Sequence, residues 1–191
     1  PALPAGVEEG ILRGIYRLRT CEKPDAKRRV QLFGSGSILQ QVLAAQELLA
    51  ERFDVEADVW SITSYKELRA DGLACDHWNR LHPEADARAP YIRRALGNAP
   101  GPVVAASDHM KLLPDGVAPW MDRTFVTLGT DGFGRSDTRE ALRHHFEVDP
   151  PCIALAALDA LRRDGTVQAP TVEKARAELE IDPGKADPLL A

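Results

Sequence analysis

The sequence predicts an α/β domain of three layers, in which helices cover both faces of a mainly parallel sheet of four or five strands. Short apolar runs bounded by turn residues alternate with longer segments whose apolar residues recur every three or four positions. The short runs are apolar on both alternating faces, which is typical of parallel strands buried between helices. Right-handed crossovers would place the helices alternately in two layers.

The first part of the chain is expected to form a helix, a loop, a strand and a long helix. Apolar residues at helical spacing and two early glutamates favour a helix over Glu8–Leu18. The polar residues 20–28 should form a loop before a strand at Arg29–Phe33. A glycine-serine turn at 34–37 then leads into an amphipathic helix over residues 38–52.

The middle of the chain continues the alternation of strands and helices. A strand is expected at Ala57–Ile62, and the helix after it runs to about His82. Ser64 and Glu67 stand at the spacing of a capping box, which predicts the start of that helix. After a loop over residues 83–89, a short helix at 91–96 and a third strand at 102–106 are expected.

The last third begins with a polar and partly helical stretch, Ser107–Met121, and a fourth strand at Thr124–Leu128. A glycine-rich segment, residues 129–134, separates that strand from a helix that Ser136 should cap and that ends near Phe146. Two further helices are expected over residues 151–163 and 171–179. We divide this single domain into a linker and helix (1–28), a sheet core (29–148) and packing helices (149–191).

Composition narrows the class of protein. A 44% hydrophobic and 28% charged chain of 191 residues is globular, and its net charge of −5 argues against nonspecific nucleic-acid or membrane binding. The three cysteines form no C-x-x-C pair, so we expect a reducing cytoplasm rather than a secreted disulfide scaffold. Because the chain begins with proline instead of methionine, we also expect it to be part of a longer protein.

Three loops at the carboxyl ends of the expected strands are the candidate ligand-binding segments: residues 34–37, 63–67 and 129–137. The first offers backbone N–H groups to an anion, or is a tight turn with a serine cap. The last offers two arginines to a carboxylate or phosphate, or is an ion-paired loop. The candidate residues for a ligand or an interface are Gly34, Ser35, Gly36, Ser37, Ser64, Glu67, Asp131, Arg135, Asp137, Arg139 and His144.

No catalytic residue, metal ligand set or cofactor-binding residue is predicted. Cys75, His77 and His82 are the nearest approach to a ligand cluster, but they supply too few ligands for a usual zinc site. His144 and His145 are adjacent on an expected helix, so their side chains diverge by about 100° and do not chelate one ion easily.

Longer runs of consecutive residues identify a protein family more specifically than these spacing patterns do. The sequence resembles the C-terminal domain of the homodimeric, bacterial-type pyruvate dehydrogenases of the transketolase superfamily. The resemblance extends from about Gly6 to the end of the chain. The strings that carry it are Glu9–Tyr16, Val30–Leu39, Asp58–Ser64, Trp78–Pro83 and Leu128–Val148.

This resemblance implies an enzyme that uses thiamine diphosphate and magnesium to decarboxylate pyruvate and to acetylate lipoyl groups reductively. It implies that the cofactor and the catalytic glutamate belong to other domains, and that this domain supports dimerisation and architecture. The sequence agrees, because Asp131-Gly132 is not preceded by glycine and no asparagine follows at the distance of the family's cofactor motif. The implied partners are the rest of the subunit, a homodimer partner and the lipoyl acyltransferase. The isolated chain should then be inactive.

Two alternative functions, from other functional classes, remain possible for this sequence. The chain could be a stand-alone α/β module that binds a small anion through its glycine loops. It could also be a docking module, whose acidic surface meets basic segments of other subunits.

Overall fold

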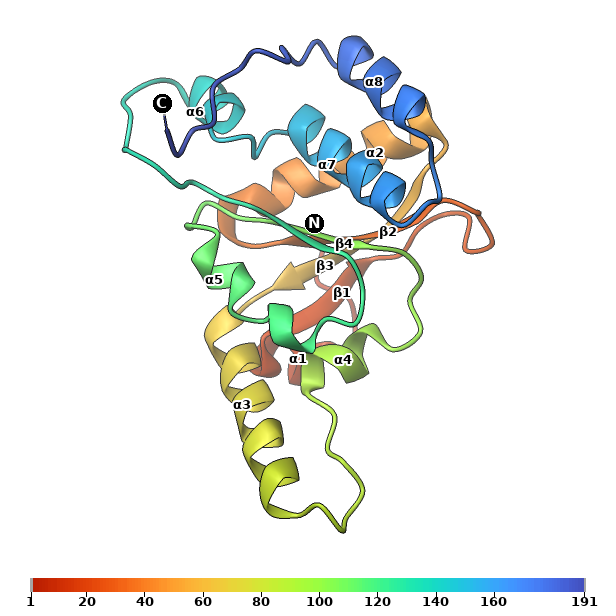
Figure 1. Ribbon diagram of the computed structural model, residues 1–191, viewed down its shortest axis with the longest axis vertical. Coiled ribbons are helices and arrows are strands. Elements are labelled where there is room, and N and C mark those ends of the chain that lie inside the picture. The colour runs from red at the N-terminus through yellow and green to blue at the C-terminus, as the bar shows by residue number, and fades with distance from the viewer. Residues whose placement is uncertain (1, 191) are drawn as a thin grey trace.

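The computed structural model describes residues 2–190 and contains one five-stranded sheet between two layers of helices (Figure 1). The strands lie in the order β1-β3-β2-β4-β5. Four of them are parallel, and β1 at the edge runs antiparallel to β3. The expected α/β sheet is thereby confirmed. The strand bounds are Ile15–Arg19 (β1), Arg29–Gly34 (β2), Glu56–Ile62 (β3), Val103–Ala106 (β4) and Phe125–Leu128 (β5).

The helix expected over Glu8–Leu18 is wrong in its second half. Helix α1 spans only Glu8–Arg13 and ends at Gly14, which has a φ of +103°. The carbonyl of Gly14 accepts hydrogen bonds from the N–H groups of Thr63 and Ser64. This turn places the following residues in β1, where the backbone pairs with β3. Apolar residues at helical spacing therefore divide between a short helix and an edge strand.

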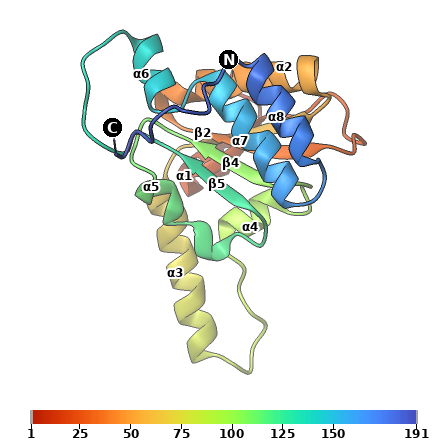
Figure 2. The ribbon, with the colours of Figure 1, turned by 45° about the horizontal axis from the view of Figure 1, so that its top comes forward.

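Two helical layers cover the sheet (Figure 2). One layer contains α2 (Leu39–Phe53), α6 (Arg139–His145), α7 (Pro150–Arg163) and α8 (Ala169–Glu178). The other contains α1, α3 (Tyr65–Leu81), α4 (Tyr91–Leu96) and α5 (Leu112–Asp115). Each layer encloses its own apolar cluster, and β2 contributes Leu32 to one and Phe33 to the other. Side chains of the central strands are thus buried on both faces, as a covered parallel sheet requires.

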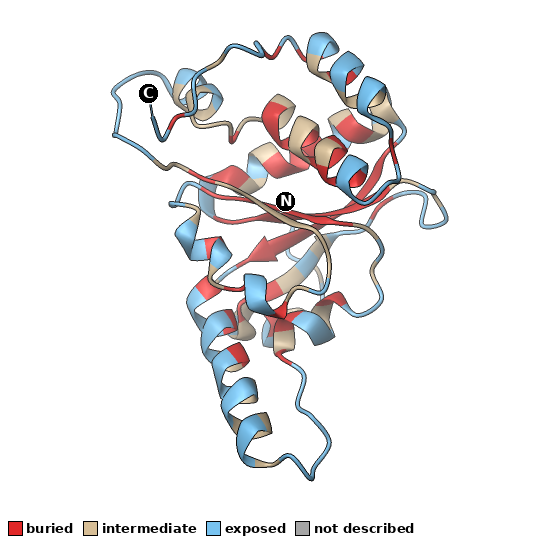
Figure 3. Ribbon diagram, in the orientation of Figure 1, coloured by how far each residue is buried: buried red, intermediate tan, exposed pale blue. Residues whose placement is uncertain are grey.

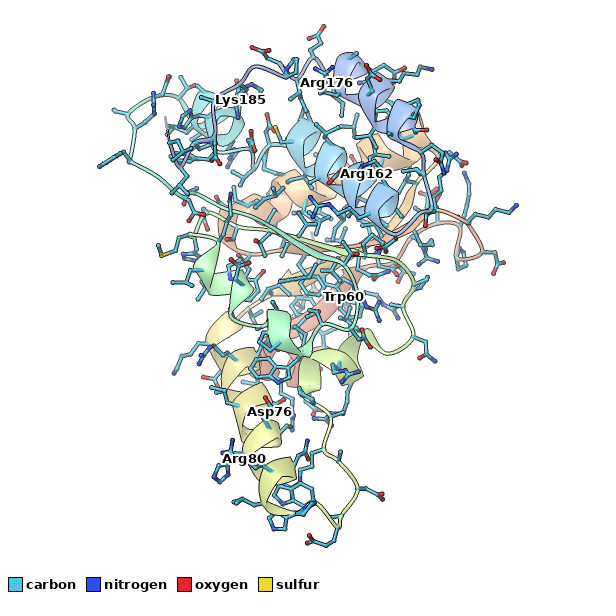
Figure 4. The ribbon with its side chains drawn as sticks, viewed as in Figure 1. Trp60, Asp76, Arg80, Arg162, Arg176 and Lys185 are labelled. Atoms are coloured by element: carbon cyan, nitrogen blue, oxygen red, sulfur yellow. The ribbon has the colours of Figure 1, made fainter. Side chains whose placement is uncertain are left out.

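Buried polar side chains tie the central strands together. The indole N–H of Trp60 on β3 donates to the amide oxygen of Gln31 on β2 at 2.8 Å (Figure 4). Arg29 and Asp58 form an ion pair at 2.8 Å between the same strands, with 8% and 2% of their side chains exposed. Asp58 also accepts the backbone N–H of Cys21, so this pair holds the loop before β2 against the sheet.

Helix α3 extends well beyond the body of the domain, and residues 82–90 return along it (Figure 1). Its outer half is largely exposed (Figure 3). At its start, the side chain of Ser64 accepts the N–H of Glu67 at 3.1 Å, which confirms the expected cap. Near its middle, Gly72 packs against the ring of Trp120.

Two boundaries near the end of the chain can be compared with the sequence. Helix α6 begins at Arg139 and is capped by Thr138, so Ser136 is not the cap that the sequence suggested. Ser136 is instead part of the loop that extends the glycine-rich segment. Helices α7 and α8 lie close to their expected positions. No helix among residues 2–190 is long and apolar enough to cross a membrane.

Candidate functional site

A cavity of about 370 Å³ lies at the carboxyl edge of the sheet, beside the ends of β2, β4 and β5. Strand order reverses between β2 and β4, because the crossover from β2 to β3 and the crossover from β3 to β4 lead to opposite sides of β2. Ligands of open α/β sheets bind at such a switch point. The lining residues are Ser37, Ile38, Asp108, Thr130, Arg139, Leu142, Arg143, Phe146 and Val148.

The turn after β2 forms one wall of this carboxyl-edge cavity. Gly36 has a φ of +54°, and a Cβ there would lie 3.1 Å from a carboxylate oxygen of Asp108. The hydroxyl of Ser37 donates to Oδ2 of Asp108 at 3.3 Å. Gly34 is buried at the strand end, and the Ser35 hydroxyl is buried without a hydrogen-bond partner among residues 2–190. The turn is thus held close to the loop after β4.

The segment after β5 forms a second wall and is tied to the same loop. Thr130 donates its hydroxyl to the carbonyl of Asp108 at 2.9 Å and its N–H to the carbonyl of His109 at 3.0 Å. Asp131 accepts the backbone N–H of Lys111 at 3.1 Å. Two of the three loops predicted from the sequence are therefore brought together, and the loop after β4 joins them.

The chemistry of the carboxyl-edge cavity combines positive charge with apolar surface. Helix α6 contributes Arg139 and Arg143, and neither has an ion-pair partner within 4.0 Å in the described chain. Asp108 is the carboxylate among the lining residues, and it already accepts from Ser37. Four apolar residues complete the lining. Such a cavity suits a small anion that carries an apolar group.

The remaining predicted residues do not line this cavity. Ser64 and Glu67 form the start of α3, and the neighbouring Thr63 donates to the carbonyl of Ile11 in α1. Arg135 and Asp137 border a separate hollow of about 350 Å³ beside His145. Asp137 accepts the N–H of Thr138 at 2.7 Å, which orders the approach to α6.

His144 makes a contact that the sequence did not suggest. Its Nδ1 lies 2.8 Å from Oδ2 of Asp149, whose other oxygen accepts the N–H of Cys152 and caps α7. Burial raises the pKa of the Cys152 thiol well above its usual value. The ligand atoms of these three residues lie within 4.8 Å of one another, a grouping that Cys75, His77 and His82 do not form. The helix cap and the histidine contact account for this arrangement without an ion.

Seven of the nine residues that line the carboxyl-edge cavity are not among the candidate residues predicted from the sequence, although Thr130 lies in the candidate loop 129–137. They are Ile38, Asp108, Thr130, Leu142, Arg143, Phe146 and Val148. Asp108 follows the third expected strand in the same way as Ser37 follows the first, so the strand-end rule could have found it. Arg143 and Phe146 depend on the orientation of α6, which no local pattern fixes.

The fold and the strand-end site define a class of protein: an α/β domain of the kind found at the end of transketolase-like enzymes. The profile of the transketolase-like TK C-terminal domain matches residues 14–149, and the chain belongs to this family. The solved transketolases of Pichia stipitis and Leishmania mexicana share its fold, with TM-scores of 0.55 and 0.53 at 19% identity. These matches cover 86% and 83% of this chain, and 20% of each transketolase.

The similar curated proteins are named pyruvate dehydrogenase E1 component. Those of Pseudomonas aeruginosa and Escherichia coli K12 are 47% and 48% identical over 190 and 192 residues. The matches cover 99% and 100% of this chain. The protein of Mycobacterium tuberculosis is 43% identical over 180 residues and 94% of the chain. The chain spans only about a fifth of the length of these relatives, 21%, 21% and 19%.

Proposed function

We propose that this chain is the architectural C-terminal domain of a pyruvate dehydrogenase that decarboxylates pyruvate and reductively acetylates lipoyl groups. It supports the dimer and the arrangement of the other domains, and it takes no part in the chemical steps. The proposal is supported by similarity to pyruvate dehydrogenase E1 components over nearly the whole chain. The cytoplasm, a homodimer partner and the lipoyl acyltransferase are proposed with it.

The observation that carries this role is a set of exposed apolar side chains at the carboxyl edge of the sheet, on the loop after β4, at the start of α5 and on the segment after β5. Met110, Leu112, Leu113 and Phe133 have 55%, 71%, 38% and 84% of their surface exposed. We call them the carboxyl-edge apolar residues. The contact between Lys111 and Asp131 ties the segment after β4, which includes the start of α5, to the segment after β5. Large side chains exposed together mark a surface that another protein segment covers.

The proposed occupant of this surface is the rest of the same polypeptide or its dimer partner. The relatives have about four-fifths of their length outside the region that this chain matches. A segment of that size offers enough surface to cover the exposed residues, and burying them stabilises the assembly by about 25 cal/mol per Å² of apolar area.

Thiamine diphosphate and magnesium are proposed to bind elsewhere in the full enzyme. Magnesium bound to a diphosphate needs several oxygen ligands from the protein and water. The carboxyl-edge cavity offers the single carboxylate of Asp108, which is occupied by Ser37, and its two arginines would compete with a cation. The donor set of this cavity therefore does not fit the cofactor, and no chemical step is assigned to it.

The test uses the full-length enzyme with Phe133→Ser, and separately with Arg135→Ala and Asp137→Ala together. We expect weaker dimerisation or a lower rate, because both changes alter the segment proposed to face the partner. Sedimentation velocity and the rate of pyruvate decarboxylation measure the two effects. Leu81→Ser, at the far end of α3, is the matched control, because Leu81 is also exposed (59%). Unchanged sedimentation and rate in both variants would contradict the proposal.

A second function is favoured by one observation, the unpaired Arg139 and Arg143 at the carboxyl-edge cavity. They support the stand-alone reading, in which the domain binds a small anion. A docking role toward other subunits has no comparable support among the described contacts. Anion binding by the isolated chain that is lost on Arg139→Gln would favour the stand-alone reading.

A further inference from the structure

A second cavity, of about 380 Å³, lies in the helical layer that contains α1, α3 and α4. It is separate from the carboxyl-edge cavity and shares no lining residue with it. It is surrounded by the end of α1, the middle of α3, the returning segment after α3 and helix α4. We call it the arginine pocket. It is lined by Arg13, Asp71, Ala74, Cys75, Arg88, Ala89 and Arg94.

Aromatic rings hold all three arginines of this pocket. The guanidinium carbon of Arg88 lies 3.9 Å from the centre of the Trp78 ring. Those of Arg13 and Arg94 lie 4.9 Å and 5.6 Å from the centre of the Tyr91 ring. A ring face attracts a guanidinium group and leaves its N–H donors free at the edges. The three side chains are thus positioned before any ligand arrives.

The backbone beside Arg88 is also fixed. The side-chain amide of Asn79 donates to the carbonyl of Arg88 at 3.0 Å, and its oxygen accepts the N–H of Arg88 at 2.7 Å. This reciprocal pair holds the returning segment against α3. The small side chains of Ala74 and Ala89 leave the space between the arginines open.

Positive charge exceeds negative charge in the arginine pocket. Arg13 pairs with Glu9 at 3.0 Å and lies 3.7 Å from Asp71. Asp71 also accepts the N–H of Tyr91 at 2.6 Å. Within residues 2–190, Arg88 and Arg94 have no ion-pair partner inside 4.0 Å. One lining carboxylate therefore faces three guanidinium groups, and two of these groups are unpaired.

The thiol of Cys75 also lines the arginine pocket. Burial raises its pKa, Asp71 adds to this effect, and Arg94 and Arg88 act in the opposite direction. Both unpaired guanidinium groups line the same pocket as this thiol. Cys75 is partly exposed, whereas Cys21 and Cys152 are buried. An alkylating reagent should consequently reach Cys75 first.

We propose that the arginine pocket binds a phosphate group, either free phosphate or the phosphate of a small metabolite. Three guanidinium forks that converge from different segments match a compact group with several acceptor oxygens and more than one negative charge. A single carboxylate would satisfy one fork and leave the others unpaired. This inference is independent of the proposed role in pyruvate dehydrogenase.

The test titrates the 191-residue chain with inorganic phosphate, pyrophosphate and glycerol phosphate at constant ionic strength, by isothermal calorimetry. We expect saturable binding at one site per chain. Arg88→Gln and Arg94→Gln should each weaken it about tenfold or more, because each removes a charge-assisted hydrogen bond. Arg80→Gln is the matched control, since Arg80 lies on α3 outside the pocket (Figure 4) and its loss should leave the affinity unchanged.

A second measurement keeps the result clear if a variant folds poorly. Bound phosphate should slow the alkylation of Cys75 by iodoacetamide, and Cys75→Ser identifies the signal. Comparison of inorganic phosphate, pyrophosphate and glycerol phosphate distinguishes binding of free phosphate from binding of an esterified phosphate group. Equal weakening by Arg80→Gln, or no protection of Cys75 at saturating concentrations of all three ligands, would overturn the proposal. Protection by a glutamate-rich peptide alone would also overturn it, because the pocket would then recognise a protein segment.

Discussion

At the scale of single residues, close packing contacts affect stability more than helix propensity does. Gly72 is in the interior of α3, where alanine is the better helix former by up to about 1 kcal/mol. A Cβ at this position would lie 2.4 Å from the Trp120 ring. That ring is buried, and its N–H donates to Asp76 at 2.9 Å (Figure 4), so it does not move aside easily.

We therefore expect Gly72→Ala to lower the free energy of unfolding by about 1–3 kcal/mol, the usual cost of overpacking, despite the gain in propensity. Urea unfolding followed by circular dichroism measures the change. Gly134→Ala is the control, because a Cβ there meets nothing within 4 Å. A neutral or stabilising effect of Gly72→Ala would show that the Trp120 ring can be displaced at no cost.

His145 predicts a dependence of stability on pH. Desolvation lowers its pKa, and the charges of Arg135 and Lys185 lower it further. Its Nε2 atom is buried without a hydrogen-bond partner in the described part of the chain. Lys185 reaches this region from the C-terminal segment and donates to the carbonyl of His145 at 2.9 Å (Figure 4).

Because the pKa of His145 is lower in the folded state than in the unfolded state, the unfolded chain binds the extra proton first. Stability should fall as the pH is lowered through the unfolded value of about 6.5 toward the folded value. The melting temperature of His145→Gln should change less over this range than that of the wild type. Parallel pH profiles of the two proteins would refute this explanation.

At the scale of elements, the sequence predicted the four parallel strands and their crossover helices, because each has its own pattern of apolar residues and its own flanking turn residues. It did not predict β1. Ile15 and Leu18 fit a helical repeat, but the left-handed turn at Gly14 and pairing with β3 override that repeat. In the carboxyl-edge cavity, the lining residue Ser37 was among the predicted candidates, because the ends of the strands could be located from the sequence. Arg143 faces the cavity only because α6 packs as it does, and local sequence carries no signal for packing.

The buried ion pair of Arg29 and Asp58 links β2 to β3, in addition to the backbone pairing of the two strands. Removing one partner leaves the other charge buried, so Asp58→Asn should destabilise the fold by about 3–5 kcal/mol. The double variant Arg29→Met with Asp58→Leu should be less destabilised than the sum of its single variants, since no uncompensated charge remains. Denaturant unfolding of the wild type, Arg29→Met, Asp58→Leu and the double variant measures the coupling between the two charges. Additive effects would mean that the two charges act separately.

At the scale of the whole molecule, the domain has two apolar clusters, which lie on opposite faces of one sheet. This packing is that of a three-layer α/β domain, with helices on both faces of one sheet. The carboxyl-edge apolar residues are exposed instead, and they belong to neither cluster. The residues that stabilise the fold and the residues proposed to support assembly are therefore different sets, and each set can be altered separately.

The same separation predicts that the 191-residue chain does not turn over pyruvate. It should fold, because an apolar cluster is buried on each face of the sheet, yet the carboxyl-edge cavity lacks a donor set for magnesium and the cofactor. The assay supplies thiamine diphosphate, magnesium, pyruvate and an artificial electron acceptor, with the full-length enzyme as the positive control. We expect no rate above background from a chain whose circular dichroism shows a folded α/β protein. A robust rate from the folded chain would place the catalytic groups within these residues and would remove the basis for a purely architectural role.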